Sequence, residues 1–192
     1  MNAGIVVMAA GLSQRYRQAS GQHKLLIRHP ACRNLQLLAY TLQMAIAACG
    51  KRVNVVVRPD DRQIVELAQR YRCATTLIES DGLGSSIAAG VAAQPAWGGW
   101  LVMLANLPWL QLSTIKQVYA GLAVADVVRP LWQGQAGYPV GFNANLREQL
   151  LALKGEDEGR HVFSCSPPLL LEVNDPGCVQ NINMPADWLV RR

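Results

Sequence analysis

The sequence lacks the long apolar run that a membrane-spanning helix needs, and no basic segment precedes its first apolar stretch. It also lacks any Cys-x-x-Cys pair, because its five cysteines are scattered along the chain. That spacing argues against a zinc site and against a disulfide framework, and it favours separate thiols in a reducing compartment. We therefore expect a cytoplasmic protein that has no membrane partner.

Charge is scarce as well. Charged residues make up 16% of the 192 residues, and the cations behind the net charge of +5 form no dense block. Because nucleic-acid surfaces usually combine clustered cations with aromatic platforms, we expect no nucleic-acid partner, and an anionic small molecule suits the chain better. Hydrophobic residues reach 51% without an interrupting linker or repeat, so the length predicts one compact domain over residues 1–192.

What is present is a regular alternation of short apolar runs with helical patterns. The runs predict strands over residues 5–10, 53–57, 75–78, 100–105 and 126–129. Apolar positions at helical spacing predict helices over residues 35–48, 61–72, 85–93 and 114–122. Strands that alternate with helices imply right-handed β-α-β units. We therefore predict an α/β fold with a mostly parallel sheet, which binds its ligands at the carboxyl ends of the strands.

The first strand runs into a loop that offers groups for a phosphate. Ile5–Ala10 leads to Gly11, where backbone can approach a ligand closely, and then to the hydroxyl of Ser13. Arg15 and Lys24 add two cations, and backbone N–H groups with Arg and Lys are what a polyphosphate needs. The sequence thus predicts a nucleotide site, although neither of the commonest phosphate-loop patterns occurs. An ordinary strand-to-helix loop with solvated cations is the alternative.

This loop resembles the signature of the nucleotidyltransferases that build the dinucleotide forms of the molybdenum cofactor. Their pattern is Leu-Ala-Ala-Gly-x-Ser-x-Arg-x-Gly-x-x-Lys, and Met8–Arg15 with Lys24 follows it, except that Arg17 replaces the second glycine and the stretch to Lys24 is longer. The resemblance implies a Rossmann-like three-layer nucleotidyltransferase fold in which Arg15 and Lys24 neutralise the outer phosphates. It also implies nucleotide contacts at Ala9, Ala10, Gly11, Leu12 and Ser13.

A second nucleotide-contacting segment is implied at a helix start. Asp81–Ile87 is glycine-rich and resembles the family's Gly-Met/Leu-Ser/Gly-Ser-Ser-Leu/Ile segment, which contacts the nucleotide. The resemblance therefore implies nucleotide contacts at Gly84, Ser85 and Ser86. A plain capped helix start accounts for these residues equally well.

The expected metal position departs from the family pattern. Leu104–Trp109 resembles Leu-Ala-Asp-x-Pro, whose aspartate holds Mg²⁺ against the triphosphate, but this chain has Asn106 there. An amide oxygen carries no charge, whereas Mg²⁺ prefers anionic oxygens. The resemblance thus implies a Mg²⁺ cofactor held weakly, if at all, by Asn106. If an acid elsewhere replaces the missing carboxylate, Asp175 and Asp81 are the expected candidates.

Three later segments resemble the parts of the family that complete the substrate site. Residues 138–142 resemble a Gly-His-Pro-Val-x-Phe strand, and residues 155–160 resemble a Gly-Asp-x-Gly-x-Arg loop, for which a solvated acidic loop is the alternative. Residues 181–187 resemble Asp-Ile-Asp-Thr-Pro-Glu-Asp or its Asn-Val-Asn form, which is commoner in guanylyl relatives. The implied substrate-binding residues are Tyr138, Pro139, Arg160, Asn181 and Asn183.

The resemblance extends from Ile5 to Trp188. It implies transfer of CMP from CTP, or of a nucleotide from another NTP, to a pterin phosphate with release of pyrophosphate. Positioning and charge stabilisation would supply the catalysis. Two alternatives remain open. Asn106, Asn181 and the stretched loop favour a catalytically degenerate paralogue that binds a nucleotide or pterin without turnover. A nucleotidyltransferase that acts on a sugar phosphate or another phosphorylated metabolite is the other.

Overall fold

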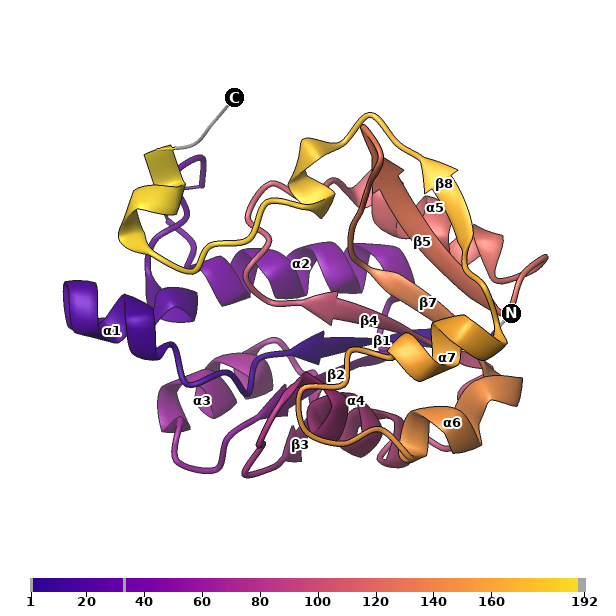
Figure 1. Cartoon of the computed structure of the whole chain (residues 1–192). Coiled ribbons are helices and arrows are strands. Elements are labelled where there is room, and N and C mark those ends of the chain that lie inside the picture. The colour runs from indigo at the N-terminus through magenta and orange to yellow at the C-terminus, as the bar shows by residue number, and fades with distance from the viewer. Residues whose placement is uncertain (1, 33, 190–192) are drawn as a thin grey trace.

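The computed structural model describes residues 2–32 and 34–189, which form three layers around a mixed, mostly parallel sheet (Figure 1). In the described part of the chain this sheet has eight strands: β1 (Ala3–Met8), β2 (Val53–Val57), β3 (Ala74–Leu77), β4 (Gly99–Leu104), β5 (Val127–Trp132), β6 (Gln135–Ala136), β7 (Val140–Asn143) and β8 (Leu169–Glu172). Their order is β3-β2-β1-β4-β7-β5-β6, with β8 beside β5. Strands β3, β2, β1 and β4 run parallel, whereas β7 is antiparallel to both neighbours.

Helices cover both faces of the sheet because its strands carry apolar side chains on both sides. Ile5 and Val7 of β1 face one core, and Val6 and Met8 face the other. The first core contains side chains of α2 (Leu37–Cys49), α3 (Arg62–Arg70) and α5 (Leu112–Gly121). The second contains side chains of α4 (Leu83–Ala92), α6 (Arg147–Leu151) and α7 (Arg160–Cys165). The Rossmann-like three-layer α/β fold is therefore confirmed.

The remaining elements are short and lie around the strand ends. They are α1 (Gln14–Ser20) and the 3-10 turns η1 (Lys24–Leu26), η2 (Ala144–Leu146), η3 (Pro176–Cys178) and η4 (Pro185–Leu189). The C-terminal segment, yellow in Figure 1, lies beside α1, which comes early in the sequence. The Trp188 indole nitrogen donates to the Tyr16 hydroxyl at 3.0 Å. This contact brings residues 181–187 to the same edge of the sheet as the loop after β1.

The predicted strands and helices are present, with ends that differ by up to three residues. The largest difference is in β5, which was expected to end at Arg129 but continues through Pro130 to Trp132. A proline usually marks the end of a strand because it cannot donate to the ladder. Here the Pro130 carbonyl still accepts from the Gly137 N–H at 2.8 Å, so the ladder continues around the turn to β6.

The cysteines and the helix lengths bear on two further expectations. All five cysteines are free thiols, and burial raises the pKa of Cys49 and of Cys178 to about 11, so neither is a reactive thiolate. In the described residues, no helix combines the length and the apolar character that crossing a membrane requires.

Candidate functional site

The loops after β1 and β4 meet at one edge of the sheet. Met8 and Leu104 are aligned as the last residues of these neighbouring parallel strands, so Ala9 and Ala105 follow at the same level and Asn106 comes one residue later. A cavity of about 500 Å³ opens at this edge, and we name it the Lys24 cavity. It is lined by Met8, Ala9, Ala10, Gly11, Leu12, Lys24, Leu25, Ser80, Asp81, Gly82, Leu83, Ser86, Leu104, Asn106, Glu156, Glu158, Asn181 and Asn183. Parallel α/β sheets bind ligands at such an edge.

The loop after β1 lines this cavity with small or apolar residues and their backbone. Ala9 extends the sheet by donating its N–H to the Val56 carbonyl at 2.9 Å, and Gly11 and Leu12 are exposed on the cavity wall. Ser13 points elsewhere: it is 9% exposed, does not line the cavity, and its Oγ lies 3.2 Å from Nε2 of His23. The hydroxyl of Ser13 is thus occupied by the protein, so its predicted nucleotide contact gains no support from its placement.

Lys24 is the cation that faces the cavity. Its ammonium donates to Oδ1 of Asn183 at 3.1 Å. Burial is the main reason that the pKa of Lys24 is lowered to about 8, and the nearby guanidinium of Arg15 lowers it further. Arg15 itself is exposed and does not line the cavity. The structure therefore brings Lys24 to the predicted site and leaves Arg15 at its outer margin.

The asparagines at the expected metal position are bonded to each other. The amide nitrogen of Asn106 donates to the Ile182 carbonyl at 3.0 Å and to Oδ1 of Asn183 at 3.3 Å. A carbonyl can only accept, so the Asn106 nitrogen must face Ile182. Oδ1 of Asn183 then already has two donors, Asn106 and Lys24. A divalent cation here would meet neutral oxygens beside an ammonium, so these residues as arranged do not fit the implied Mg²⁺.

Carboxylates lie on another part of the cavity wall. Asp81, Glu156 and Glu158 all line it. Within the described ranges, however, no group of three or more His, Cys, Asp or Glu side chains is placed to hold a metal ion. Asp81 therefore lies on the cavity wall, where an acid could replace the missing carboxylate, but it is not part of a preformed metal cluster.

The expectation that Asp175 could replace the missing carboxylate is wrong. Asp175 is 1% exposed and lies outside the cavity. Its two oxygens accept from the backbone N–H of Gln111 at 2.9 Å, the hydroxyl of Thr114 at 2.6 Å and the N–H of Gly177 at 2.9 Å. These bonds join the start of α5 to η3, so the carboxylate is held within the protein and away from the Lys24 cavity.

The glycine-rich turn before α4 serves mainly to dock the acidic loop. The N–H of Gly84 donates to the Gly155 carbonyl at 2.8 Å, and the Ser85 hydroxyl accepts from the Gly155 N–H at 2.9 Å. A Cβ at Gly82 would collide with the backbone of Gly155, so only glycine permits this approach. Gly84 and Ser85 do not line the cavity, whereas Ser86 does. This contact carries Glu156 and Glu158 into the cavity. The motifs placed residues 155–160 in the substrate site but named only Arg160 as a binding residue. The glycines on both segments were the signal that could have indicated this contact.

The predicted acceptor residues fall into two groups. Asn181 and Asn183 line the cavity, and Asp187 fixes their turn by accepting from the N–H of Asn183 at 2.7 Å. Tyr138, Pro139 and Arg160 do not line it. Tyr138 is half-buried beneath the guanidinium of Arg129, 5.4 Å from the ring centre, and burial raises its pKa to about 12. Arg160 is exposed beyond the acidic loop, its N–H 3.2 Å from Asp157.

Comparison with known proteins places this geometry in a family. No curated protein sequence matches the chain. Rv0371c from Mycobacterium tuberculosis H37Rv has a similar structure, with a TM-score of 0.82 and 21% identity over 98% of this chain and 96% of that one. A further structure of that protein is a complex with manganese.

Two other solved structures carry names that describe a function. Molybdopterin-guanine dinucleotide biosynthesis protein A from Archaeoglobus fulgidus has a TM-score of 0.70 and 19% identity, over 97% of this chain and 95% of that one. A cytidylyltransferase from Leptospira borgpetersenii has a TM-score of 0.74 and 13% identity, over 98% and 84%. Identities this low establish a shared fold alone.

Membership follows from the sequence family instead. The family described as the MobA-like NTP transferase domain matches residues 5–170, which is most of the chain. The matched range includes the loop after β1, Lys24, Asn106 and the acidic loop. This chain therefore belongs to the MobA-like NTP transferase domain family, the group of nucleotidyltransferases that its sequence motifs resemble.

Proposed function

We propose that the Lys24 cavity binds CTP and that the chain transfers CMP to a pterin phosphate with release of pyrophosphate. The observation that carries this proposal is the meeting of Lys24, the backbone of residues 9–12, Asn106 and Asn183 in one cavity at the carboxyl edge of the sheet. Exposed backbone and an ammonium suit a polyphosphate. The family membership supports the reaction class.

The proposed step is a displacement at the α-phosphorus. An oxygen of the acceptor phosphate forms the new P–O bond, the bond to the α,β-bridging oxygen breaks, and pyrophosphate leaves with that electron pair. Lys24 neutralises the outer phosphates and the leaving pyrophosphate, and Asn106 contacts the nucleotide beside it. The protein's contribution is to position the two phosphates and to stabilise charge.

Base preference gives one test of the nucleotide assignment. Ala10 lines the cavity and is only 5% exposed, so the surrounding residues hold its methyl group in a fixed position. We expect CTP to bind more tightly than GTP, because the methyl crowds a purine, and Ala10→Gly to reduce the preference by about tenfold, which is the discrimination that one methyl commonly gives. Calorimetric titration of both proteins with both nucleotides measures this. Tighter binding of GTP by the wild type contradicts the cytosine assignment.

The charge state of Lys24 gives a second test. We expect the affinity for CTP to fall as the pH rises from about 7 to about 9.5. The pKa of Lys24 is about 8 without ligand, and bound phosphates favour the charged form, so binding at alkaline pH must take up a proton. Lys24→Arg stays charged over this range and should bind with little pH dependence. Titrations at both pH values measure the difference, and equal slopes for the two proteins argue against Lys24 as a phosphate ligand.

A second candidate function is supported by one contact. The bond from Asn106 to Asn183 occupies the place expected for the metal, which favours a paralogue that binds a nucleotide or pterin without turning it over. A sugar phosphate or another phosphorylated metabolite is the alternative acceptor. Pyrophosphate release with each of the four NTPs, with Mg²⁺ or Mn²⁺ and with molybdopterin, separates the pterin transferase from the paralogue. Turnover with molybdopterin supports the transferase, and binding without turnover supports the paralogue.

A further inference from the structure

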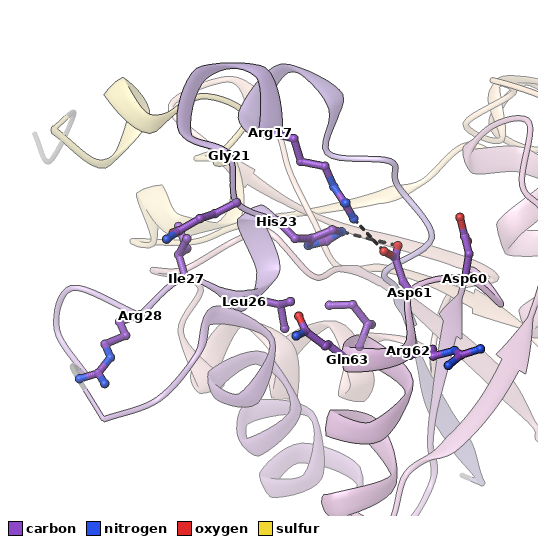
Figure 2. A pocket seen from close by; sticks show the side chains of 12 residues that line it. Arg17, Gly21, His23, Leu26, Ile27, Arg28, Asp60, Asp61, Arg62 and Gln63 are labelled. Atoms are coloured by element: carbon purple, nitrogen blue, oxygen red, sulfur yellow. Dashed lines mark hydrogen bonds and ion pairs between the residues drawn. The ribbon is translucent and has the colours of Figure 1, made fainter.

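A second, larger cavity lies on the other side of the segment that carries Lys24. Its volume is about 850 Å³, and Figure 2 shows Arg17 and His23 on its wall, both directed toward Asp61. His23 lines this cavity, whereas its neighbour Lys24 lines the Lys24 cavity. The two residues are therefore part of the wall between the cavities. We call Ser13, Arg17, His23 and Asp61 the His23 cluster.

The hydrogen bonds of His23 fix where its proton lies. The N–H of Leu25 donates to Nδ1 of His23 at 3.2 Å, so Nδ1 is an acceptor and the proton of the neutral ring is on Nε2. Nε2 then donates to Oγ of Ser13 at 3.2 Å, and the Asp61 carboxylate lies 3.7 Å from the same nitrogen. Burial lowers the pKa of His23 below its ordinary value, although Asp61 opposes this shift, and a lowered pKa favours the neutral ring at pH 7.

This arrangement holds the loop rather than activating a nucleophile. Ser, His and Asp are the residue types of a catalytic triad, but there the imidazole accepts the serine proton and donates to the aspartate through its other nitrogen. In the His23 cluster, Ser13 and Asp61 approach the same nitrogen, which carries a proton. His23 is therefore a donor to Ser13, and Ser13 is not activated.

The backbone of Ser13 needs such support. Its φ of 54° is in the left-handed region, where residues other than glycine are strained unless their surroundings fix them. Ser13 directly follows Gly11 and Leu12, which line the Lys24 cavity. Release of Ser13 would therefore allow these two residues to move from the cavity wall.

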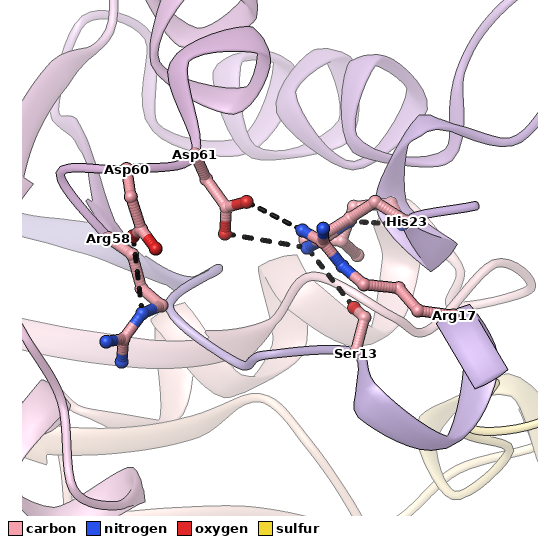
Figure 3. Close-up of polar contacts among 7 residues, drawn as sticks. Ser13, Arg17, His23, Arg58, Asp60 and Asp61 are labelled. Carbon is pink, nitrogen blue, oxygen red and sulfur yellow. Dashed lines mark hydrogen bonds and ion pairs between the residues drawn. The ribbon is translucent and has the colours of Figure 1, made fainter. Parts of the chain in front are cut away.

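An ion pair between two members of the cluster supports it. Arg17 donates to Asp61 at 2.7 Å, so α1 is connected to the start of α3 (Figure 3). Arg17 occupies the position where the family pattern has a glycine, and His23 belongs to the lengthened stretch before Lys24. Two of the four residues of the His23 cluster thus lie where the chain departs from that pattern.

We propose that His23 is a positioning residue that holds the nucleotide-binding loop over the Lys24 cavity, with Asp61 and Arg17 as its support. The effect on nucleotide affinity rests on the proposed function, because it assumes that the nucleotide binds in this cavity. The effect on the loop itself does not, and it can be measured without any ligand.

The experiment compares two variants that each keep one bond of the imidazole. His23→Asn keeps an acceptor for the Leu25 N–H but cannot reach Ser13, whereas His23→Gln can still donate to Ser13 but loses the acceptor near the backbone. We expect amide exchange at Arg17, whose N–H donates to the Ser13 carbonyl at 2.8 Å, to be faster in His23→Asn than in the wild type and nearly unchanged in His23→Gln. We expect the Kd for CTP to rise about tenfold in His23→Asn, the usual effect of one lost hydrogen bond, and to change little in His23→Gln.

A matched pair of aspartates tests the support. Asp60 and Asp61 are neighbours, but Asp60 lies 3.4 Å from Arg58 and outside the cluster (Figure 3). Asp61→Asn should speed amide exchange at Arg17, whose N–H donates to the Ser13 carbonyl, and Asp60→Asn should not. The proposal is overturned if both His23 variants exchange like the wild type, or if His23→Gln alone is affected, since capping of η1 would then be the whole role of His23. Faster loop exchange in His23→Asn without CTP binding by the wild type would leave the positioning role intact and overturn the proposed function.

Discussion

Asn106→Asp should turn a slow or inactive protein into a faster nucleotidyltransferase that depends on a divalent cation. In the wild type, the Asn106 nitrogen donates to the Ile182 carbonyl and to Oδ1 of Asn183. A carboxylate would present an oxygen to both acceptors, and the resulting repulsion favours uptake of a cation between them. Mg²⁺ also prefers the anionic oxygen. The substitution therefore creates both the demand for a metal and a ligand that suits it.

We expect turnover to rise by at least about tenfold, where each factor of ten corresponds to about 1.4 kcal/mol of transition-state stabilisation. Pyrophosphate release measured against Mg²⁺ and Mn²⁺ concentration gives this number. The thermal midpoint of the variant should be below that of the wild type without metal and should rise when metal is added. Asn181→Asp is the matched control, because Asn181 lines the same cavity and its substitution changes the charge by the same amount. A fast wild type that Asn106→Asp does not improve would indicate that another acid, such as Asp81, holds the metal.

Lys24→Ala should weaken triphosphate binding much more than monophosphate binding. Lys24 is the ammonium on the cavity wall, and its bond to Asn183 directs it toward the site. A hydrogen bond to a charged group contributes about 1.5–3 kcal/mol, which corresponds to roughly 10- to 150-fold in Kd. A lysine that faces the outer phosphates gives this contribution to CTP and little of it to CMP.

Calorimetric titrations of the wild type and Lys24→Ala with CTP and with CMP measure the two losses. Arg15→Ala is the control for general electrostatic attraction, because Arg15 is exposed and lies outside the cavity wall. It should cause a smaller, salt-sensitive loss. Equal losses for CTP and CMP in Lys24→Ala, or no loss, would contradict the assignment of Lys24 to the outer phosphates.

Motif positions were a better guide to backbone than to side chains. The loop after β1 and the position of Asn106 could be predicted together, because parallel neighbouring strands bring their carboxyl ends to one edge. The direction of each side chain could not. Ser13 and Ser85 both match the family pattern, yet one hydroxyl bonds to His23 and the other to the backbone of Gly155. Those partners are 10 and 70 residues away in the sequence.

The sequence by itself determined the alternation of strands and helices, the edge of the sheet at which the site lies, and the absence of a carboxylate at residue 106. These follow from periodicity, from strand order in β-α-β units and from residue identity, which are local properties. Only the tertiary structure decided that Lys24 and Asn106 donate to Asn183 at the expected metal position. It also decided that Asp175 bonds to the start of α5 and to η3, and that the His23 ring bonds to Ser13. Each of these depends on hydrogen bonds between segments that packing brings together, and no spacing along the chain specifies such bonds.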